Sequence, residues 1–126
     1  MPLVRISLRR GKSPDYRRQL AEGVYAAMVE AFAVPEEDKF VVVHEHDEAD
    51  FVFSPRYLGI ARDDDLVIVQ ITANNTRTVE QKKALVSAVA AHLGREPGVR
   101  PENVLVQLIE VAKENWSFGN GIAQYA

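Results

Sequence analysis

The chain reads LVRISLRRGKSPDYRRQLAEGVYAAMVEAFAVPEEDKFVVVHEH over residues 3–46, and this stretch predicts a strand, a helix and a second strand. Residues 3–8 alternate in polarity, as a strand with one buried face does. Ser13 supplies a helix N-cap and is followed by a proline, which suits the first helical position. The helix then has an apolar stripe at four-residue spacing, formed by Tyr16, Leu20, Val24, Met28 and Phe32. Pro35 ends this helix, and residues 40–46 form the second strand.

The second half of the chain repeats this order. Residues 66–73 form an apolar strand, and Thr78 caps a helix with a glutamine three residues on, which is the spacing of a capping box. Gly94 is the expected terminator of that helix, and residues 104–111 form the last strand. The buried stripe of the second helix is predicted to consist of Leu85, Val86, Val89 and Leu93.

The repeat predicts the fold class. Corresponding segments lie about 65 residues apart, so we expect one domain of 126 residues with an internal repeat over about 2–62 and 63–126. Parallel pairing within each half requires a crossover helix. The prediction is an α/β (α+β) domain, in which two β-α-β units related by a pseudo-twofold form a four-stranded mixed sheet with two helices on one face.

The other face of this sheet needs a cover. Four residues are too apolar for a freely solvated sheet, namely Val41, Val69, Ile71 and Leu105. Symmetric assembly buries such a face economically. We therefore expect a homo-oligomer.

Composition excludes several classes of function. The net charge of -3 argues against binding to nucleic acid or to an anionic membrane, which requires basic patches. The chain has no cysteine, which excludes disulfides and thiol chemistry. No apolar run approaches the roughly 20 residues of a transmembrane helix, and the N-terminus lacks a signal-peptide pattern. We expect a cytoplasmic protein that binds neither nucleic acid nor membranes.

Two patterns could be mistaken for ligand sites. His44 and His46 share one face of a predicted strand, but no third ligand has the fixed spacing that would complete a metal site, so none is predicted. Residues 119–121 read Gly-Asn-Gly, yet they follow no strand and open no long helix. We interpret them as a turn.

Doubled strand–helix–strand units that begin with Met1-Pro2 resemble the tautomerase superfamily, and several segments resemble its malonate semialdehyde decarboxylase-like branch. These segments are Met1-Pro2-Leu3, AMVEAF (27–32), VPEED (34–38), EQK (80–82) and WSFGNG (116–121). The similarity covers essentially the whole chain, and the C-terminal segment is its most specific part. It implies a homotrimer with a pocket beside each N-terminal proline. It also implies chemistry on small 2-oxo or 3-oxo acids with no cofactor and no metal.

Pro2 is the first candidate catalytic residue. Removal of Met1 leaves a secondary amine without peptide resonance, whose lone pair can accept a proton or attack a carbonyl. Apolar surroundings lower the pKa of such an amine, and a neighbouring carboxylate raises it. Pro2 can therefore act as a base in keto–enol transfer or as a cationic acid in hydration and decarboxylation. The structural alternative is a proline that only begins an edge strand.

Arg77 and Asn75 are the candidate carboxylate ligands. Arg77 precedes the second helix, where a guanidinium can bind a carboxylate bidentately, and antiparallel halves bring this loop towards Pro2. A solvated loop arginine is the alternative. The decarboxylases that the chain resembles have Arg-Pro-Arg where this chain has Asn75-Thr76-Arg77. The missing charge favours tautomerisation over decarboxylation.

The resemblance implies further site residues. Asp38 matches an aspartate near the proline, which orients a water or raises the pKa of the amine; an ordinary acidic turn is the alternative. Trp116, Phe118 and Tyr125 match an aromatic wall that excludes water and holds a flat substrate. These rings could instead dock the C-terminal tail on a neighbouring subunit.

Three functions remain open at this stage. The leading one is a cofactor-independent keto–enol tautomerase of small 2-oxo acids, such as phenylpyruvate-like enols. The second is a decarboxylase or hydratase of the malonate semialdehyde type. The third is a trimeric, non-catalytic binding protein, because a fold alone does not establish a function.

Overall fold

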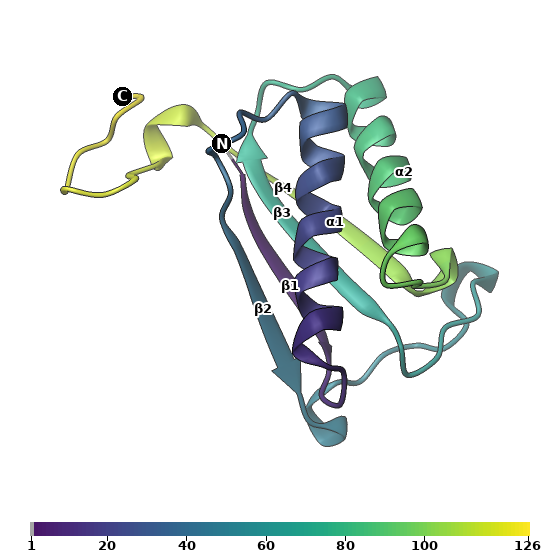
Figure 1. Cartoon of the computed structure of the whole chain (residues 1–126). Coiled ribbons are helices and arrows are strands. Elements are labelled where there is room, and N and C mark those ends of the chain that lie inside the picture. Colours follow the sequence, from purple (N-terminus) through teal and green to yellow (C-terminus); the bar gives the residue numbers. More distant parts are fainter. Residues whose placement is uncertain (1) are drawn as a thin grey trace.

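The computed structural model describes residues 2–126 and shows one four-stranded sheet with two helices on the same face (Figure 1). Its elements are β1 (Leu3–Arg9), α1 (Pro14–Phe32), β2 (Val41–His46), β3 (Val67–Asn74), α2 (Val79–Arg95) and β4 (Val104–Val111). The order in the sheet is β2-β1-β3-β4. The predicted α/β (α+β) architecture with a mixed sheet is confirmed.

The pairing of the strands creates the predicted pseudo-twofold. β1 pairs with β2 in parallel, β3 pairs with β4 in parallel, and β1 and β3 run antiparallel at the centre. Each parallel pair is connected through a helix, as parallel strands require. The central register places Leu3 opposite Thr72 and Leu8 opposite Val67. The start of β1 and the end of β3 therefore lie at the same end of the sheet.

Side-chain caps fix where both helices begin. Ser13 Oγ accepts a hydrogen bond from the Tyr16 amide at 3.1 Å, and Thr78 and Gln81 form the complete capping box. Each cap satisfies backbone N–H groups that the first helical turn leaves without partners. α1 ends at Phe32, shortly before Pro35 as predicted.

The predicted end of α2 is wrong, because the helix passes through Gly94 and ends at Arg95. The amide of Glu96 still donates to the His92 carbonyl, so the last turn closes beyond the glycine. A single glycine weakens a helix without terminating it.

The core lies between the helices and the inner face of the sheet. Four of the five predicted stripe residues of α1 are buried, and Tyr16 packs at the margin. Leu85, Val89 and Leu93 of α2 are fully buried, but Val86 is 43% exposed. The prediction for Val86 is wrong. Val86 is the next residue after Leu85, so its side chain lies off the helix face that Leu85, Val89 and Leu93 share.

The outer face of the sheet is less apolar than predicted. Val69 and Ile71 are fully buried beneath the helices, and Val41 packs against the same core. Of the four residues assigned to the outer face, only Leu105 lies there, because side chains alternate along a strand. Its neighbours on that face are both apolar and polar, namely Arg5, Val42, Ile68, Gln70, Gln107 and Ile109.

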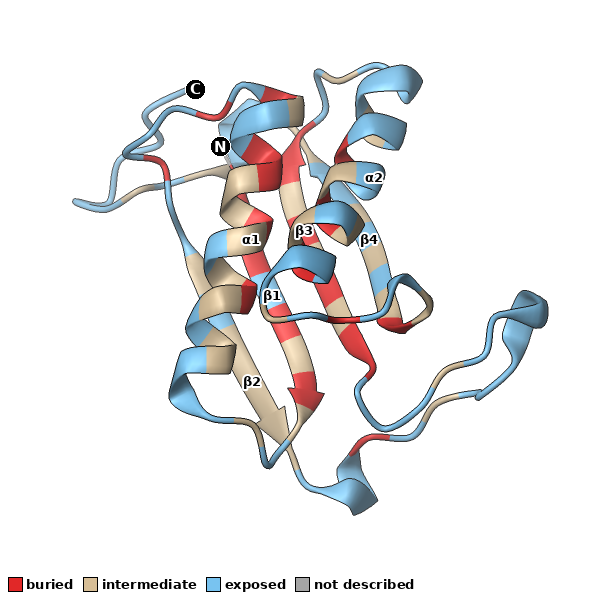
Figure 2. Cartoon of the chain, turned by 45° about the vertical axis from the view of Figure 1, so that its right-hand side comes forward, coloured by how far each residue is buried: buried red, intermediate tan, exposed pale blue. Residues whose placement is uncertain are grey.

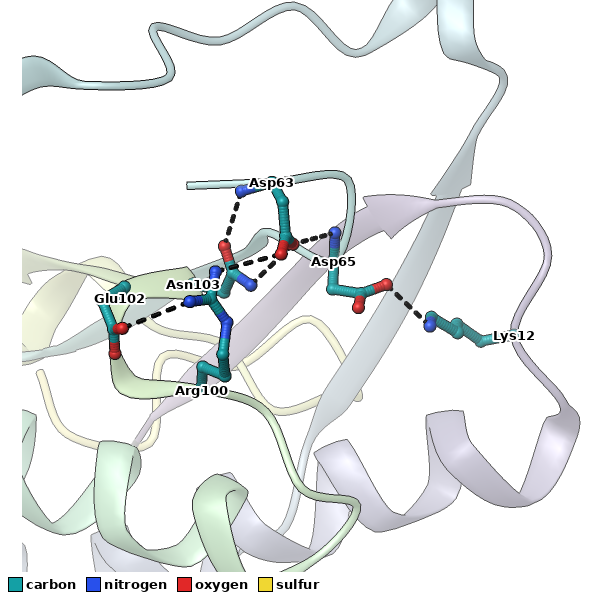
Figure 3. Close-up of polar contacts among 6 residues, drawn as sticks. All are labelled: Lys12, Asp63, Asp65, Arg100, Glu102 and Asn103. Atoms are coloured by element: carbon teal, nitrogen blue, oxygen red, sulfur yellow. Dashed lines mark hydrogen bonds and ion pairs between the residues drawn. The ribbon is translucent and has the colours of Figure 1, made fainter. Parts of the chain in front are cut away.

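Residues 47–65 form a long connection that reaches away from the sheet and helices (Figure 2). Val52 and Leu58 on it are 89% and 76% exposed. The connection is tied back at Asp63, whose amide donates to Asn103 Oδ1 at 3.0 Å, while Asn103 Nδ2 donates to Asp63 Oδ1 at 2.8 Å. Arg100 adds an ion pair to Asp63 at 3.0 Å (Figure 3).

Within residues 2–126, neither helix is long and apolar enough to cross a membrane.

Candidate active site

Several segments converge at the end of the sheet where β1 begins and β3 ends. β3 and β4 both end there, and the chain after β4 continues past the N-terminus as the C-terminal segment, residues 112–126 (Figure 1). The amide of Asn75 donates to the Val111 carbonyl at 3.0 Å and joins the two strand ends. The loop that follows α1 also reaches this end of the sheet, because the Phe40 carbonyl accepts the Val4 amide at 3.0 Å.

An apolar hollow of about 220 Å³ lies at this end of the sheet. It is lined by Pro2, Leu3, Phe40, Trp116, Ser117 and Phe118. Pro2 is buried. A small hollow with mostly apolar walls suits a small organic ligand and strengthens electrostatic interactions inside it.

Two of the three rings predicted to form an aromatic wall, those of Trp116 and Phe118, line the hollow. Trp116 and Phe118 stack at 5.5 Å between ring centroids, and the Phe40 ring lies 6.3 Å from that of Phe118. Tyr125 does not line the hollow; its ring meets Phe118 edge-on at 5.8 Å. Phe40 is one of the residues that sequence reasoning missed, because its place before an apolar strand makes it indistinguishable from the strand's first residue.

Trp116 is attached to the sheet by Asn74. The indole Nε1 donates to Asn74 Oδ1 at 2.7 Å, and Asn74 is buried at the end of β3. Sequence reasoning selected the neighbouring Asn75, whose side chain is exposed. Alternation along β3 places Asn74 on the outer face with Thr72, so its burial departs from the pattern of the strand and had no local sequence signal.

Asp38 is buried in the loop between α1 and β2, two residues before Phe40. Its amide donates to the Pro35 carbonyl at 3.0 Å, which closes a tight turn. The side chain does not line the hollow itself. Asp38 thus lies in the same loop as Phe40, which forms part of the hollow's wall. The role of Asp38 in the chemistry stays a prediction.

Arg77 lies beside the hollow rather than in it. Its Nη2 donates to the Phe32 carbonyl at 2.8 Å, and its guanidinium lies 4.7 Å from the centre of the Phe32 ring. Nη1 donates to Thr76 Oγ1 at 2.8 Å. These contacts place the positive charge at the C-terminal end of α1, where a helix favours a cation. Arg77 and Asn74 both border a second, smaller hollow, and the hydrogen bond from Trp116 to Asn74 links it to the first.

The other patterns do not join this site. His44 lies on the outer face of the sheet, with Nε2 3.3 Å from Arg5 Nη1, and His46 stacks on Phe51. Within the described residues 2–126, no group of three histidine, aspartate or glutamate side chains could hold a metal ion. Residues 119–121 form the predicted turn, with positive φ at all three positions.

The fold and the proline-lined hollow together define a tautomerase-type protein, and comparison with known families agrees. A family model described as "Tautomerase enzyme" matches residues 38–119, and a second with the same description matches residues 2–61. The chain therefore belongs to the tautomerase superfamily.

Its relatives point to one branch. The probable tautomerase YusQ of Bacillus subtilis (strain 168) is 40% identical over 124 residues, which cover 98% of each chain. The structure of FG41 malonate semialdehyde decarboxylase inhibited by 3-bromopropiolate superposes with a TM-score of 0.91 at 35% identity, over 98% of this chain and 93% of that one. A second structure of a malonate semialdehyde decarboxylase gives 0.92 at 30% identity, over 98% and 95%. The chain is thus similar to the malonate semialdehyde decarboxylase-like branch, as its motifs indicate.

Proposed function

We propose that this chain is a cofactor-independent keto–enol tautomerase of small 2-oxo acids, with Pro2 as the base. The observation that carries the proposal is the buried Pro2 in an aromatic hollow of about 220 Å³. The chemistry requires Pro2 to be the N-terminal residue. Met1, whose removal would expose this amine, lies outside the described residues.

The proton transfer is simple to balance. The Pro2 nitrogen accepts the hydroxyl proton of the enol, and the O–H electron pair stays on oxygen, which gives an enolate. An oxygen pair then forms the carbonyl π bond as the C=C π pair takes a proton at C3 from the Pro2 ammonium, which restores the neutral amine. In this proposal the apolar lining of the hollow favours the neutral amine before the reaction, because burial disfavours the cation.

Arg77 and Asn75 hold the substrate carboxylate in this proposal. The guanidinium has five N–H donors, and its two contacts with Phe32 and Thr76 leave others for a ligand. Asn75 adds a neutral amide donor. Asp38, buried near the Phe40 wall, orients a water or adjusts the protonation of Pro2.

Trp116 and Phe118 supply the wall against which a flat enol lies, and Tyr125 supports them. Offset and edge-on ring contacts of 5.5–5.8 Å are the favourable geometries for aromatic groups. A conjugated 2-oxo acid has the shape to continue this stack. We therefore favour an aryl-bearing substrate such as phenylenolpyruvate.

A second candidate function is decarboxylation or hydration of a 3-oxo or acetylenic acid, and the similarity to two malonate semialdehyde decarboxylases favours it. In that chemistry a cationic Pro2 acts as the acid, and Asp38 positions a water. Asn75 argues against it, since this chain has an amide where the decarboxylases have an arginine. A charge-assisted hydrogen bond is about twice as strong as a neutral one.

Assembly as a homotrimer forms part of the proposal. Leu105 and Ile109 on the outer face of the sheet are each 39% exposed in the single chain, and the connection of residues 47–65 presents further apolar side chains. Contact between copies would bury both.

The test is the rate of phenylenolpyruvate ketonisation in Pro2→Ala and in the matched variant Pro14→Ala. Pro14 begins α1 at the opposite end of the sheet, so it controls for the loss of a proline ring. We expect Pro2→Ala to lower kcat/KM by about 10²–10⁴-fold, the usual contribution of a general base, and Pro14→Ala to keep the wild-type value. Equal rates in all three proteins would refute the proposal. Turnover of malonate semialdehyde alone would favour the second candidate, and no turnover with any 2-oxo acid would favour a binding protein.

A further inference from the structure

Asn74 is a buried amide that the proposed chemistry does not use. It is 7% exposed, and its Oδ1 accepts the Trp116 indole N–H at 2.7 Å. An indole nitrogen can only donate, so this contact satisfies Trp116, and a buried amide oxygen left without a partner is costly. Both groups thus depend on the same hydrogen bond.

The position of Asn74 connects three parts of the site. It is the last residue of β3, on the same face as Thr72, which lies opposite Leu3 of the hollow. It also borders the neighbouring small hollow that contains Arg77. A substitution of Asn74 should therefore affect the aromatic wall directly, through the hydrogen bond to Trp116. It should affect Arg77, the proposed carboxylate ligand, only through the small hollow that both residues border.

The C-terminal segment has few other ties to the sheet. Its side-chain hydrogen bonds are internal, such as those of Gln124 with the Phe118 amide and the Gly119 carbonyl. Within residues 2–126, the Trp116–Asn74 contact is the one side-chain hydrogen bond that joins residues 112–126 to the rest of the chain. Trp116 also stacks on Phe118, so this hydrogen bond positions a pair of stacked rings, to which Phe40 adds a ring contact on Phe118.

We propose that Asn74 is a positioning residue that fixes the Trp116 wall against Pro2 through its hydrogen bond to the indole. The consequence for catalysis rests on the proposed tautomerase function. Loss of the bond lets the C-terminal segment move and opens the hollow to water. Substrate affinity then falls more than the rate of proton transfer, because Pro2 itself is unchanged.

The experiment compares Asn74→Leu with the matched variant Asn103→Leu. Both remove a buried asparagine, but Asn103, which is 1% exposed, anchors Asp63 at the start of β3, the end of the strand opposite to Asn74. The chain has one tryptophan, so its intrinsic fluorescence, excited selectively, reports Trp116 alone. We expect red-shifted emission and stronger acrylamide quenching in Asn74→Leu, with neither change in folded Asn103→Leu. Wild-type fluorescence in Asn74→Leu would overturn the proposal, and this readout does not depend on any enzymatic activity.

Kinetics provide the second readout. We expect Asn74→Leu to raise KM for phenylenolpyruvate by about fivefold to tenfold, as the loss of one buried hydrogen bond predicts, with kcat changed by less than about twofold. A fall in kcat at constant KM would contradict a positioning role.

A second variant covers the case in which Asn74→Leu fails to fold. Trp116→Phe keeps an aromatic ring and removes the donor, and we expect it to raise KM as well. Because one hydrogen bond is lost in either variant, the double variant should raise KM less than the product of the two single effects. If Asn74→Leu does not fold, a wild-type KM in Trp116→Phe overturns the proposal. If Asn74→Leu folds, a double variant whose KM rises by the full product of the two single effects also overturns it.

Discussion

Arg77 combines a structural contact with a proposed catalytic one. Its guanidinium donates to the Phe32 carbonyl at the end of α1 and lies over the Phe32 ring. The same group is the candidate ligand for the substrate carboxylate. These two roles are separable, because one affects the folded state without substrate and the other appears only in kinetics.

The variant Arg77→Met keeps most of the side-chain stem and removes the charge. We expect kcat/KM for a 2-oxo acid to fall by about a hundredfold, since a bidentate, charge-assisted pair contributes about 3 kcal/mol. Loss of the contact with the Phe32 carbonyl should lower the free energy of unfolding by about 1 kcal/mol. Urea denaturation and steady-state kinetics measure the two effects. Reduced stability with kcat/KM within about threefold of wild type would show that Arg77 is structural only.

Single residues of the site were predictable only in part. The motif residues Pro2, Trp116 and Phe118 do line one hollow. They could be predicted because a segment that matches a family motif also matches the local structure in which the motif residues lie. The resemblance did not reveal Phe40 or Asn74, since an aromatic residue before a strand and an amide at its end have many ordinary explanations. Which way the Arg77 side chain turns depends on Phe32, 45 residues earlier, and no local pattern contains that contact.

At the scale of elements, β3 begins where a long connection returns to the sheet, and Asp63 anchors that return. The pKa of Asp63 lies below its usual value of 3.8, first because the Asp65 amide donates to the carboxylate and then because the Asn103 side chain does. A carboxyl group with a lowered pKa in the folded chain stabilises it above the unfolded pKa. That stability is lost as the pH falls through the folded value.

The variant Asp63→Asn tests this anchor. We expect a lower urea midpoint than wild type at pH 7, and a difference that shrinks as the pH falls below about 4, because the wild-type carboxyl then becomes protonated too. Asp50→Asn, at an exposed carboxylate of the same connection, is the control for the change in charge. A difference that stays constant between pH 7 and pH 3 would exclude ionisation of Asp63 as its source.

The elements themselves were predicted well because their signals are local. Caps at Ser13 and Thr78, alternation in the strands and four-residue stripes in the helices all involve neighbours in the sequence. The errors occurred where packing decides. Gly94 continues a helix whose last turn closes on Glu96, and Val69 and Ile71 belong to the core because the register of β3 turns them towards the helices.

At the scale of the whole molecule, two surfaces of the single chain expose apolar side chains. Leu105 lies on the outer face of the sheet among both apolar and polar neighbours, and the connection of residues 47–65 exposes Val52 and Leu58 far from the core. Exposed apolar surface of this kind marks contact with another molecule. In the proposed homotrimer, contact between copies covers both surfaces.

The variants Leu105→Arg and Val86→Arg test the proposed trimer. Both replace an apolar residue of similar exposure by a charge, on the outer face of the sheet and on the outer side of α2, respectively. Light scattering should give three times the chain mass for wild type and Val86→Arg, and a smaller mass for Leu105→Arg, because a buried unpaired charge is costly. A monomeric wild-type protein, or a trimer that survives Leu105→Arg, would contradict this arrangement.

The central claim is that the amine of Pro2 is the reacting group. The most direct measurement is the intact mass of the protein before and after treatment with 2-oxo-3-pentynoate, followed by peptide mapping of the adduct. A neutral amine adds to the conjugated triple bond of this reagent, and the chain has no cysteine to compete. The account predicts a chain that lacks Met1 and gains one adduct, located on the peptide that begins with Pro2. A retained Met1, an unchanged mass or an adduct on any other residue would contradict it.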